Sequence, residues 1–339
     1  MVKLFYYILK RVSLSILVIL GIIVVSYILV YIAPGNPAYT WVGKPTGPKA
    51  AEAIKLAEKD LGLDKPFYIQ LYNFIKRFFS FDWGISIRFK QPVSVIVMRS
   101  LAATLELVVL AYIIALPLGI LGGVYASLHR NSIADKTIYG IASLLASSPR
   151  FWIAAITVLL LQMFNINIFG RVSTSYAISI NVYTGSYIID SLLNGRIDAF
   201  IDAVLRAMPP VFLASLYPFA LTTRIVRHAL SEELHKEYVR QLLSYGLRGR
   251  HVIRRYALRG VIPVLAQIQG ISFAYSVIDV ATIENVFGRE GIGVTLSKAI
   301  LANDYPLIIG LLAIVSILFV IAITIADIIH MVIDPRVRI

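Results

Sequence analysis

Six long apolar stretches dominate this sequence and decide what it can fold into. They cover residues 14–32, 107–128, 143–165, 207–223, 261–278 and 306–326, and only the third contains a charged residue, Arg150. Each stretch is long enough, or nearly so, to cross a hydrocarbon core of about 30 Å as a helix. Because lipid offers no hydrogen bonds, the backbone within it must satisfy its own polar groups. We therefore predict an all-α, polytopic membrane protein with six transmembrane helices in a multi-pass arrangement in the cell membrane.

The basic residues predict how the chain is threaded through the membrane. The net charge is +13, and no motif for reading nucleic acid accompanies it, so we expect no nucleic-acid partner. Lysines and arginines precede the first stretch, follow the second and fourth, and end the chain at Arg336 and Arg338. With six spans all these groups fall on one side, which is then the cytoplasmic side. Both termini are therefore predicted to be cytoplasmic, with membrane lipid as a neighbour of the basic loops.

Two regions are predicted along the chain. Residues 1–100 hold the first transmembrane helix and an external amphipathic segment, in which a turn at 33–37 precedes helices over 48–61 and 68–79. The aromatic residues of the second helix suit either the membrane interface or packing on neighbouring helices. Residues 101–335 form the transmembrane core, with a cytoplasmic loop at 231–259. Its external parts are a loop over 170–206 and a short helix over 294–301 after three closely spaced glycines.

The sequence carries no motif for chemistry of its own. It lacks the phosphate-binding GxxxxGK[ST] loop, the zinc-binding HExxH helix and the GxSxG nucleophile elbow, and it has no cysteine. We therefore expect a protein that is not an enzyme and that holds no catalytic residue, no metal and no cofactor. If the chain uses nucleotide energy, that energy must come from a separate subunit.

Polar groups inside the spans are candidates for function, because burying them in lipid is unfavourable. Arg150 can face an aqueous pathway, or it can pair with Glu106 or Asp279. In the fifth stretch the polar residues Gln269, Ser272, Ser276 and Asp279 follow each other at steps of 3, 4 and 3 residues, so they share one face of a helix. That face must contact protein or water. It is either a set of interhelical hydrogen bonds or the wall of a translocation pathway, and the sequence leaves both open.

The cytoplasmic loop contains a short amphipathic helix followed by a basic one. Acidic residues lie at or before the predicted start of the first helix, where negative charge suits the helix dipole, and Gly246 is a typical stop. The helix and its stop comprise Glu237, Tyr238, Val239, Arg240, Gln241, Leu242, Leu243, Ser244, Tyr245 and Gly246. A second, basic helix is predicted over 248–259. Such a segment is typical either of a docking site for a soluble partner or of a loop held at anionic lipid headgroups.

Several motifs in one order resemble a known family. The first span and the APGNP turn (11–38), the external segments 61–74 and 81–93, and the second span (101–127) are each similar to it. So are the loop EYVRQLLSYGLRG (within 237–265), the segment ENVFGREGIG (within 284–308) and the terminal DPRVRI. Together they resemble the permease subunits of ABC importers of the dipeptide, oligopeptide and nickel type, in particular the B-like member of the heteromeric pair. The resemblance covers nearly the whole chain.

The resemblance implies a type I importer permease fold and an ATP-driven import function. It implies that residues 237–246 form the coupling helix, which docks on a separate ATPase subunit. The implied partners are a second permease, two ATPase subunits that bind ATP and magnesium, and an extracellular solute-binding protein. Peptides are the implied cargo, with oligosaccharides or nickel as alternatives, and a stand-alone channel or ion-coupled carrier is the alternative of another class.

Three departures from the family pattern stand out. Family members usually have small residues where this chain has the bulkier Gln241–Tyr245 segment, so its docking surface is expected to differ. Arg150 replaces a residue that is usually small or apolar, and Asn36 replaces a usual aspartate.

Overall fold

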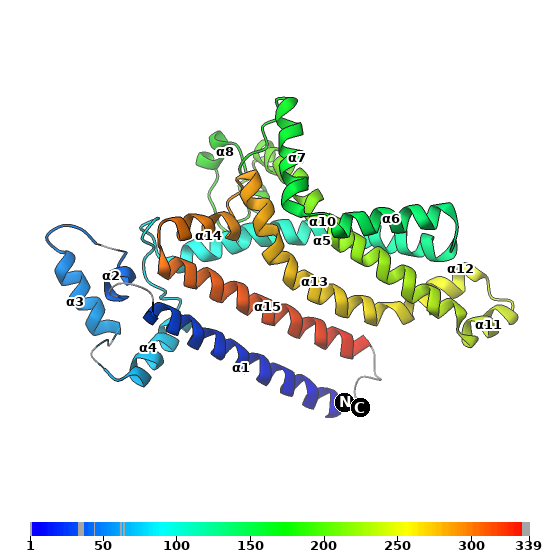
Figure 1. Ribbon diagram of the computed structural model, residues 1–339, viewed down its shortest axis with the longest axis horizontal. Helices are drawn as coiled ribbons and strands as arrows, with labels where there is room; N and C mark the ends of the chain where they lie inside the picture. The colour runs from blue at the N-terminus through cyan, green and yellow to red at the C-terminus, as the bar shows by residue number, and fades with distance from the viewer. Residues whose placement is uncertain (1, 33–36, 44, 62, 64, 334–339) are drawn as a thin grey trace.

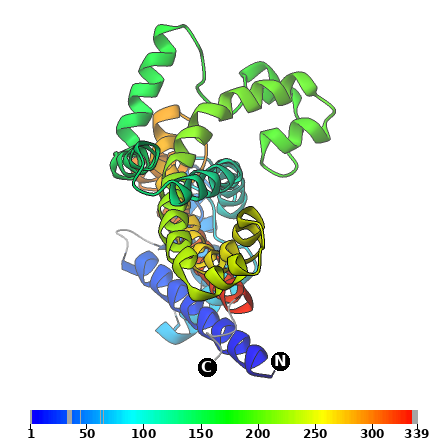
Figure 2. The same cartoon turned by 90° about the vertical axis from the view of Figure 1, so that its right-hand side faces the viewer.

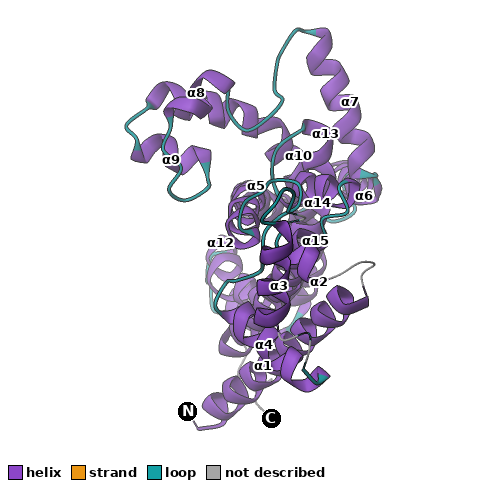
Figure 3. Ribbon diagram, turned by 90° about the vertical axis from the view of Figure 1, so that its left-hand side faces the viewer, coloured by secondary structure: helices purple, strands orange, loops and turns teal. Residues whose placement is uncertain are grey.

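The protein is described here by a computed structural model that covers residues 2–32, 37–43, 45–61, 63 and 65–333. The turn predicted at 33–37 falls mostly outside the described residues, as do Asn36, Arg336, Arg338 and the terminal DPRVRI motif. In the part that is described the chain is helical, with no strand (Figure 3).

Long helices build the body of the molecule (Figure 1). They are α1 (Val2–Ile32), α5 (Val93–Leu128), α10 (Ile197–His235), α13 (Leu258–Phe287) and α15 (Tyr305–Ile333). Their order in space is α1, α15, α13, α10 and α5, each packed on the next. Among the described residues these are the five helices long and apolar enough to cross a membrane, or six spans if the bent pair described next counts as one. The polytopic all-α prediction is confirmed.

The third predicted span is not one straight helix. It consists of the end of α6 (Ile133–Ser147) and all of α7 (Arg150–Met163), and these two helices meet at 96°. The bend lies at Ser148 and Pro149, both of which have extended backbone angles. A residue before proline disfavours the α conformation, which explains why α6 ends there. The helix α7 then projects from the side of the bundle (Figures 1 and 2). The short helices α8 (Thr174–Ser179) and α9 (Tyr187–Leu193) project on the other side, as Figure 3 shows.

The α5–α10 contact depends on two glycines one turn apart. Gly119 and Gly123 lie on the face of α5 that meets α10. A methyl group at Gly123 would lie 2.6 Å from Cβ of Val226 and 2.8 Å from the backbone oxygen of Thr223. Small residues at this spacing let two helix backbones approach closely in a membrane. The sequence shows the spacing, and the structure shows which helix it meets.

The segment after α1 packs as a small aromatic unit at one end of the bundle. It holds α2 (Pro37–Trp41), α3 (Ala50–Leu61) and α4 (Phe67–Phe79). Phe74 and Phe78 of α4 are buried, and the ring of Phe78 stacks on Trp83 with centroids 5.1 Å apart. Tyr68 and Tyr72 are exposed on the opposite face. The helices expected at 48–61 and 68–79 are therefore confirmed, and the inner face of α4 packs on protein.

The opposite end of the bundle holds α11 (Glu237–Ser244) and α12 (Gly249–Val252), followed by a π-helical turn, η1 (Ile253–Ala257), that leads directly into α13. The start of α1 and the end of α15 point toward this end, whereas α14 (Ile292–Leu301) lies at the other (Figure 1). The predicted loop 231–259 is shorter than expected. Because α10 continues to His235, Glu232 and Glu233 belong to its last turn and not to the start of the next helix.

Candidate coupling helix and buried polar sites

The first candidate site is the predicted coupling helix, and its two ends are well defined. Lys236 has an extended backbone between α10 and α11, so the chain changes direction there. At the other end Gly246 has a φ of +80°, which glycine adopts without strain. The amide of Gly246 donates to the carbonyl of Leu243 (3.0 Å), and that of Leu247 donates to the carbonyl of Leu242 (3.3 Å). This pair of bonds is a Schellman motif, which stops the helix.

The two faces of α11 have different environments. Val239 is buried against the rest of the protein, with 2% of its surface exposed. In contrast, Leu243 is 47% and Tyr245 81% exposed, and Arg240 and Gln241 are exposed beside them. The helix thus uses one apolar residue to hold its place and presents two others outward. The exposed face is free for contact with another molecule.

A single carboxylate, Glu233, joins α11 to the membrane helices. Glu233 lies in the last turn of α10 and is 9% exposed. The hydroxyl of Tyr238 on α11 donates to its Oε2 atom at 2.8 Å, and Lys236 forms an ion pair with Oε1. Burial and the nearby carboxylate raise the pKa of Tyr238 to about 12, so the phenol keeps its proton and donates. The start of α11 is therefore held by α10.

The same carboxylate also contacts α13. A methyl group at Gly260 would lie 2.5 Å from Cδ and Oε1 of Glu233, so a larger residue there would force the carboxylate to move. The side chain of Glu233 thus extends from α10 to the surface of α13, while it accepts a hydrogen bond from Tyr238 of α11. The joint comprises Glu233, Lys236, Tyr238 and Gly260, and we call it the α11 joint. Through these four residues α11 is held against two long helices.

The polar stripe predicted on the fifth span is buried between helices in this structure. Gln269, Ser272 and Ser276 are each about 5% exposed. The hydroxyl of Tyr112 on α5 contacts the hydroxyls of Ser272 (2.9 Å) and Ser276 (3.2 Å). The amide of Gln269 donates to Thr222 on α10 at 2.8 Å. These are interhelical hydrogen bonds, one of the two interpretations of the stripe. A pathway role for the three residues stays a prediction.

Asp279, the fourth member of the stripe, is partly exposed and pairs with Arg150. The Nη1 atom of Arg150, the first residue of α7, forms a salt bridge with Oδ2 of Asp279 on α13. The guanidinium also lies 4.6 Å from the ring centre of Tyr217 on α10. Of the two partners considered for Arg150, the structure brings Asp279 to it and not Glu106. Both side chains of the pair keep part of their surface exposed.

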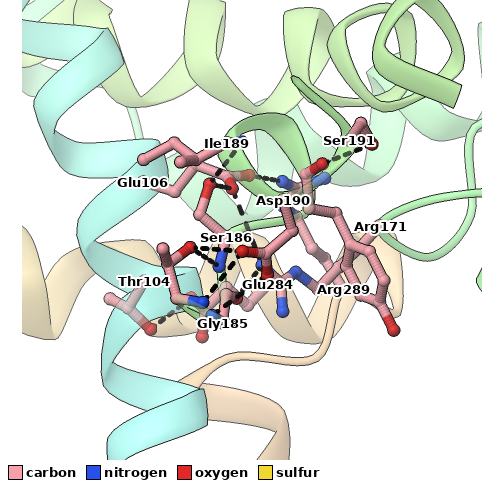
Figure 4. Close-up of polar contacts among 12 residues, drawn as sticks. Thr104, Glu106, Arg171, Gly185, Ser186, Ile189, Asp190, Ser191, Glu284 and Arg289 are labelled. Atoms are coloured by element: carbon pink, nitrogen blue, oxygen red, sulfur yellow. Dashed lines mark hydrogen bonds and ion pairs between the residues drawn. The ribbon is translucent and has the colours of Figure 1, made fainter. Parts of the chain in front are cut away.

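A second group of charges, which we call the buried polar cluster, lies near the end of the bundle where α14 is found. It consists of Thr104, Glu106, Arg171, Ser186, Glu284 and Arg289 (Figure 4). Glu106 on α5 accepts from Ser186 and pairs with Arg289, which is 1% exposed. Arg171 lies 3.6 Å from the same carboxylate. The cluster thus joins α5 to two loops that are far apart in the sequence.

Glu284 ties the second half of the cluster together. It is fully buried and accepts from the hydroxyl of Thr104 (2.6 Å) and the backbone amide of Gly293 (2.7 Å). Thr104 also accepts from the amide of Ile292 at 2.9 Å. The missing side chain of Gly291 leaves room for the Glu284 carboxylate. Gly291 thus lets this loop approach the buried carboxylate closely.

The sequence shows where the carboxylates of this cluster lie but not which residues pair with them. Glu106 directly precedes one apolar stretch, and Glu284 follows another by six residues. Arg171, Ser186 and Arg289 lie in loops, where a charged residue is ordinary. A carboxylate at a span end implies a partner, but the sequence does not say which loop arginine supplies it.

Comparison with known proteins gives a consistent picture. Residues 92–339 match the family described as the binding-protein-dependent transport system inner membrane component, and residues 4–108 match the description of its N-terminal part. The dipeptide transport system permease protein DppB of Escherichia coli is 31% identical over 335 residues, 98% of each chain. The probable D,D-dipeptide transport system permease protein DdpB of the same organism is 29% identical over 325 residues, which cover 95% of this chain and 94% of that protein. A putative peptide transport system permease protein of Brucella abortus is 30% identical over 335 residues, again 98% of each chain.

Proposed function

This chain belongs to the family of binding-protein-dependent transport system inner membrane components, and from this premise we propose that it forms half of the translocation pathway of an ATP-driven peptide importer. It is a multi-pass protein of the plasma membrane and a transport permease component, not itself an enzyme. The other half of the pathway would come from a second, related permease. A solute-binding protein outside the membrane would deliver the cargo.

The observation that carries this proposal is that α11 is exposed on one face and bound to the long helices on the other. Its outer face, with Leu243 and Tyr245, is exposed, whereas its base is fixed by the α11 joint to α10 and α13. A helix that is free on one side and anchored on the other is suited to transmit a push from a soluble partner. We infer that two ATPase subunits, one for each permease, bind ATP and magnesium and move α11 during their cycle. The larger side chains of Gln241–Tyr245 would fill a correspondingly wider groove on the ATPase.

Dipeptides or oligopeptides are the cargo we propose. The relatives that align over nearly all of this chain are named as peptide or dipeptide transport permeases. The test is uptake by cells that lack the gene for this chain and receive it back with its partner subunits. Labelled dipeptides are expected to accumulate only when the chain is present. Uptake of labelled oligosaccharide or of nickel ions in place of peptides would contradict the proposed cargo.

The coupling role can be tested separately with two glycines. Gly246 and Gly249 both have open space around them, but only Gly246 has a positive φ. Replacing Gly246 with valine is expected to distort the end of α11, so that peptide uptake and ATPase stimulation both fall while the purified chain unfolds at an unchanged temperature. Gly249→Ala is the matched control and should transport normally. Glu237→Gln, at the first residue of α11, is expected to act like the Gly246 variant. Unchanged uptake and ATPase stimulation in both Gly246→Val and Glu237→Gln would contradict the coupling role.

A further inference from the structure

Five arginines and one histidine surround an open hollow of about 600 Å³ at the end of the bundle where α11 lies. We call it the basic hollow, and its lining residues are Arg248, Arg250, His251, Arg254, Arg255 and Arg259. They come from the segment that runs from the start of α12 through η1 into the first turn of α13. All six side chains are exposed. The α11 joint does not use any of them.

The π-helical turn explains why the arginines face the same side. In an α-helix neighbouring positions on one face are three or four residues apart, whereas a π turn bonds residue i to residue i+5. Arg250, Arg254, Arg255 and Arg259 are separated by four, one and four residues, with η1 covering residues 253–257. The wider turn lets both Arg254 and Arg255 join the hollow between the other two. Single π turns inside α-helices are frequent at functional sites.

These arginines lack the acidic partners that other arginines of this protein have. Arg227 pairs with Asp135, Arg150 with Asp279 and Arg289 with Glu106. Within the part of the chain that the structure describes, none of the five arginines of the hollow forms a salt bridge or a side-chain hydrogen bond. A concentration of five unpaired cations around one concave surface favours binding of an anion.

The position of the hollow along α13 identifies the kind of anion. The apolar part of this helix begins at Val261, two residues after Arg259. At about 1.5 Å per residue, Arg254, Arg255 and Arg259 lie within roughly 10 Å of the apolar boundary. The headgroup layer of a bilayer is about 5–8 Å thick on each side. These three side chains therefore reach the depth at which lipid phosphates are found.

The residues beside the hollow fit a lipid better than a soluble protein. Ile262 and Val264 follow Arg259 on α13, and both are more than 40% exposed. Tyr256, within η1, is also exposed, and tyrosine is a typical residue of the membrane interface. An anionic headgroup in the hollow would place its acyl chains along this exposed apolar flank. A soluble acidic surface would leave the flank without a partner.

From this arrangement we propose that the basic hollow binds the phosphate of an anionic phospholipid headgroup and holds the base of α13 at the membrane surface beside α11. Arginine suits this task because its planar guanidinium binds phosphate through two parallel hydrogen bonds. The site does not depend on the identity of the transported solute. It adds a lipid contact to α12 and η1, the segment that connects α11 to α13.

The test uses the full-length chain purified in a zwitterionic detergent, with fluorescent phosphatidylglycerol as the probe and fluorescent phosphatidylcholine for comparison. Each basic residue near an anionic surface contributes about fivefold to affinity, so three together contribute about a hundredfold. The variant R254Q/R255Q/R259Q is therefore expected to bind phosphatidylglycerol about a hundredfold more weakly than the wild type. Binding of phosphatidylcholine is expected to be weak for both.

Two variants serve as controls. K49Q/K55Q/K59Q removes three exposed positive charges at the opposite end of the molecule and should bind phosphatidylglycerol like the wild type. R254K/R255K/R259K keeps the charges of the hollow but loses the planar fork, so we expect an affinity between those of the wild type and the glutamine variant. Thermal unfolding of each purified variant establishes that it is folded.

Three results would overturn the proposal. The first is equal affinity of the glutamine variant and the wild type for phosphatidylglycerol. The second is displacement of the lipid by an equal concentration of inorganic phosphate, which would make the hollow a site for free phosphate. The third needs no variant: a preference for phosphatidylglycerol that does not weaken when salt is raised would show that charge does not hold the lipid.

Discussion

At the scale of single residues, the position of α11 depends on one buried carboxylate. Glu233 accepts from Tyr238, pairs with Lys236 and fills the space above Gly260. A carboxylate that is removed from water is stable only if its oxygens have partners, so these contacts depend on one another. In sequence Glu233 is one of three nearby glutamates and nothing distinguishes it. Its role follows from burial, which only the packing of α10 against α13 produces.

Removing the hydroxyl of Tyr238 should loosen α11 without unfolding the spans. A hydrogen bond to a charged acceptor stabilises by about 1.5–3 kcal/mol. In Tyr238→Phe we therefore expect the amides of residues 237–244 to exchange with deuterium at least about tenfold faster than in the wild type. Tyr245→Phe is the matched control, because Tyr245 is 81% exposed and is not part of the α11 joint. Equal exchange in the two variants would show that the hydroxyl of Tyr238 does not hold the helix.

At the scale of helices, close packing and paired charges fix how the elements meet. The glycines of α5 set its distance to α10, and the Arg150–Asp279 pair fixes the start of α7 against α13. In a membrane the hydrophobic effect does not distinguish one helix neighbour from another, since lipid is as apolar as the helices. Steric fit and polar pairs are therefore what select the partners.

The α5–α10 contact predicts opposite effects for the same substitution at two glycines. Alanine is a better helix former than glycine by about 1 kcal/mol, so Gly140→Ala, where the space is open, should leave the thermal unfolding temperature unchanged or raise it. Gly123→Ala places a methyl group against the backbone oxygen of Thr223 and should lower it, with a loss of about 1–3 kcal/mol. A higher unfolding temperature for Gly123→Ala would mean that α5 and α10 are not this close.

Exchanging the charges of Arg150 and Asp279 distinguishes a structural ion pair from a role of Arg150 in the translocation pathway. Either single change, Arg150→Asp or Asp279→Arg, leaves like charges facing each other and should lower both stability and uptake. The double variant restores an ion pair of reversed polarity and should recover most of both. This partly exposed pair is expected to contribute about 1 kcal/mol. If the double variant recovers its unfolding temperature but not its uptake, the positive charge of Arg150 itself acts in the pathway.

At the scale of the whole molecule, the two ends of the bundle have different characters. One end carries α11, the basic hollow and the exposed arginines, and the other carries the aromatic unit around α4 together with the buried polar cluster. The positive-inside rule predicts that the basic end faces the cytoplasm. In that orientation the exposed face of α11 would lie where the proposed ATPase subunit can reach it.

The absence of cysteine makes this orientation directly measurable. A single cysteine at Lys55, exposed on α3, is expected to react with a membrane-impermeant maleimide in intact cells. A single cysteine at Arg240, exposed on α11, should react only after the cells are permeabilised. The reverse labelling pattern would place α11 outside the cell and exclude its role in docking an ATPase.

The sequence predicted most of the helices because their signals are local. Apolar stretches, charge placement and glycine stops act within a few turns of the chain. They predict the five long helices, the helices in 48–79 and 294–301, and the end of α11 at Gly246. They do not predict where each long helix begins and ends. The helix α10 continues beyond both ends of its apolar stretch, because charged residues can remain helical where they reach water or a partner. The third span is predicted as a pair of apolar runs interrupted at Arg150, but the sequence does not show that the two helices meet at an angle of 96°.

What the sequence by itself determined is that this chain is an all-α membrane protein, with a short amphipathic helix in its largest basic loop and the motifs of one transporter family. What only the tertiary structure decided is which side chains pair with each other. Arg150 pairs with Asp279 and not with Glu106, whose partners are two loop arginines, and Glu233 joins three helices. The basic hollow also required a π turn that no sequence signal indicated. The reason is physical: helix formation and membrane insertion depend on neighbours in the chain, whereas the pairing of buried charges depends on distances between residues that are far apart in the sequence. Glu106 and Arg289, for example, are 183 positions apart.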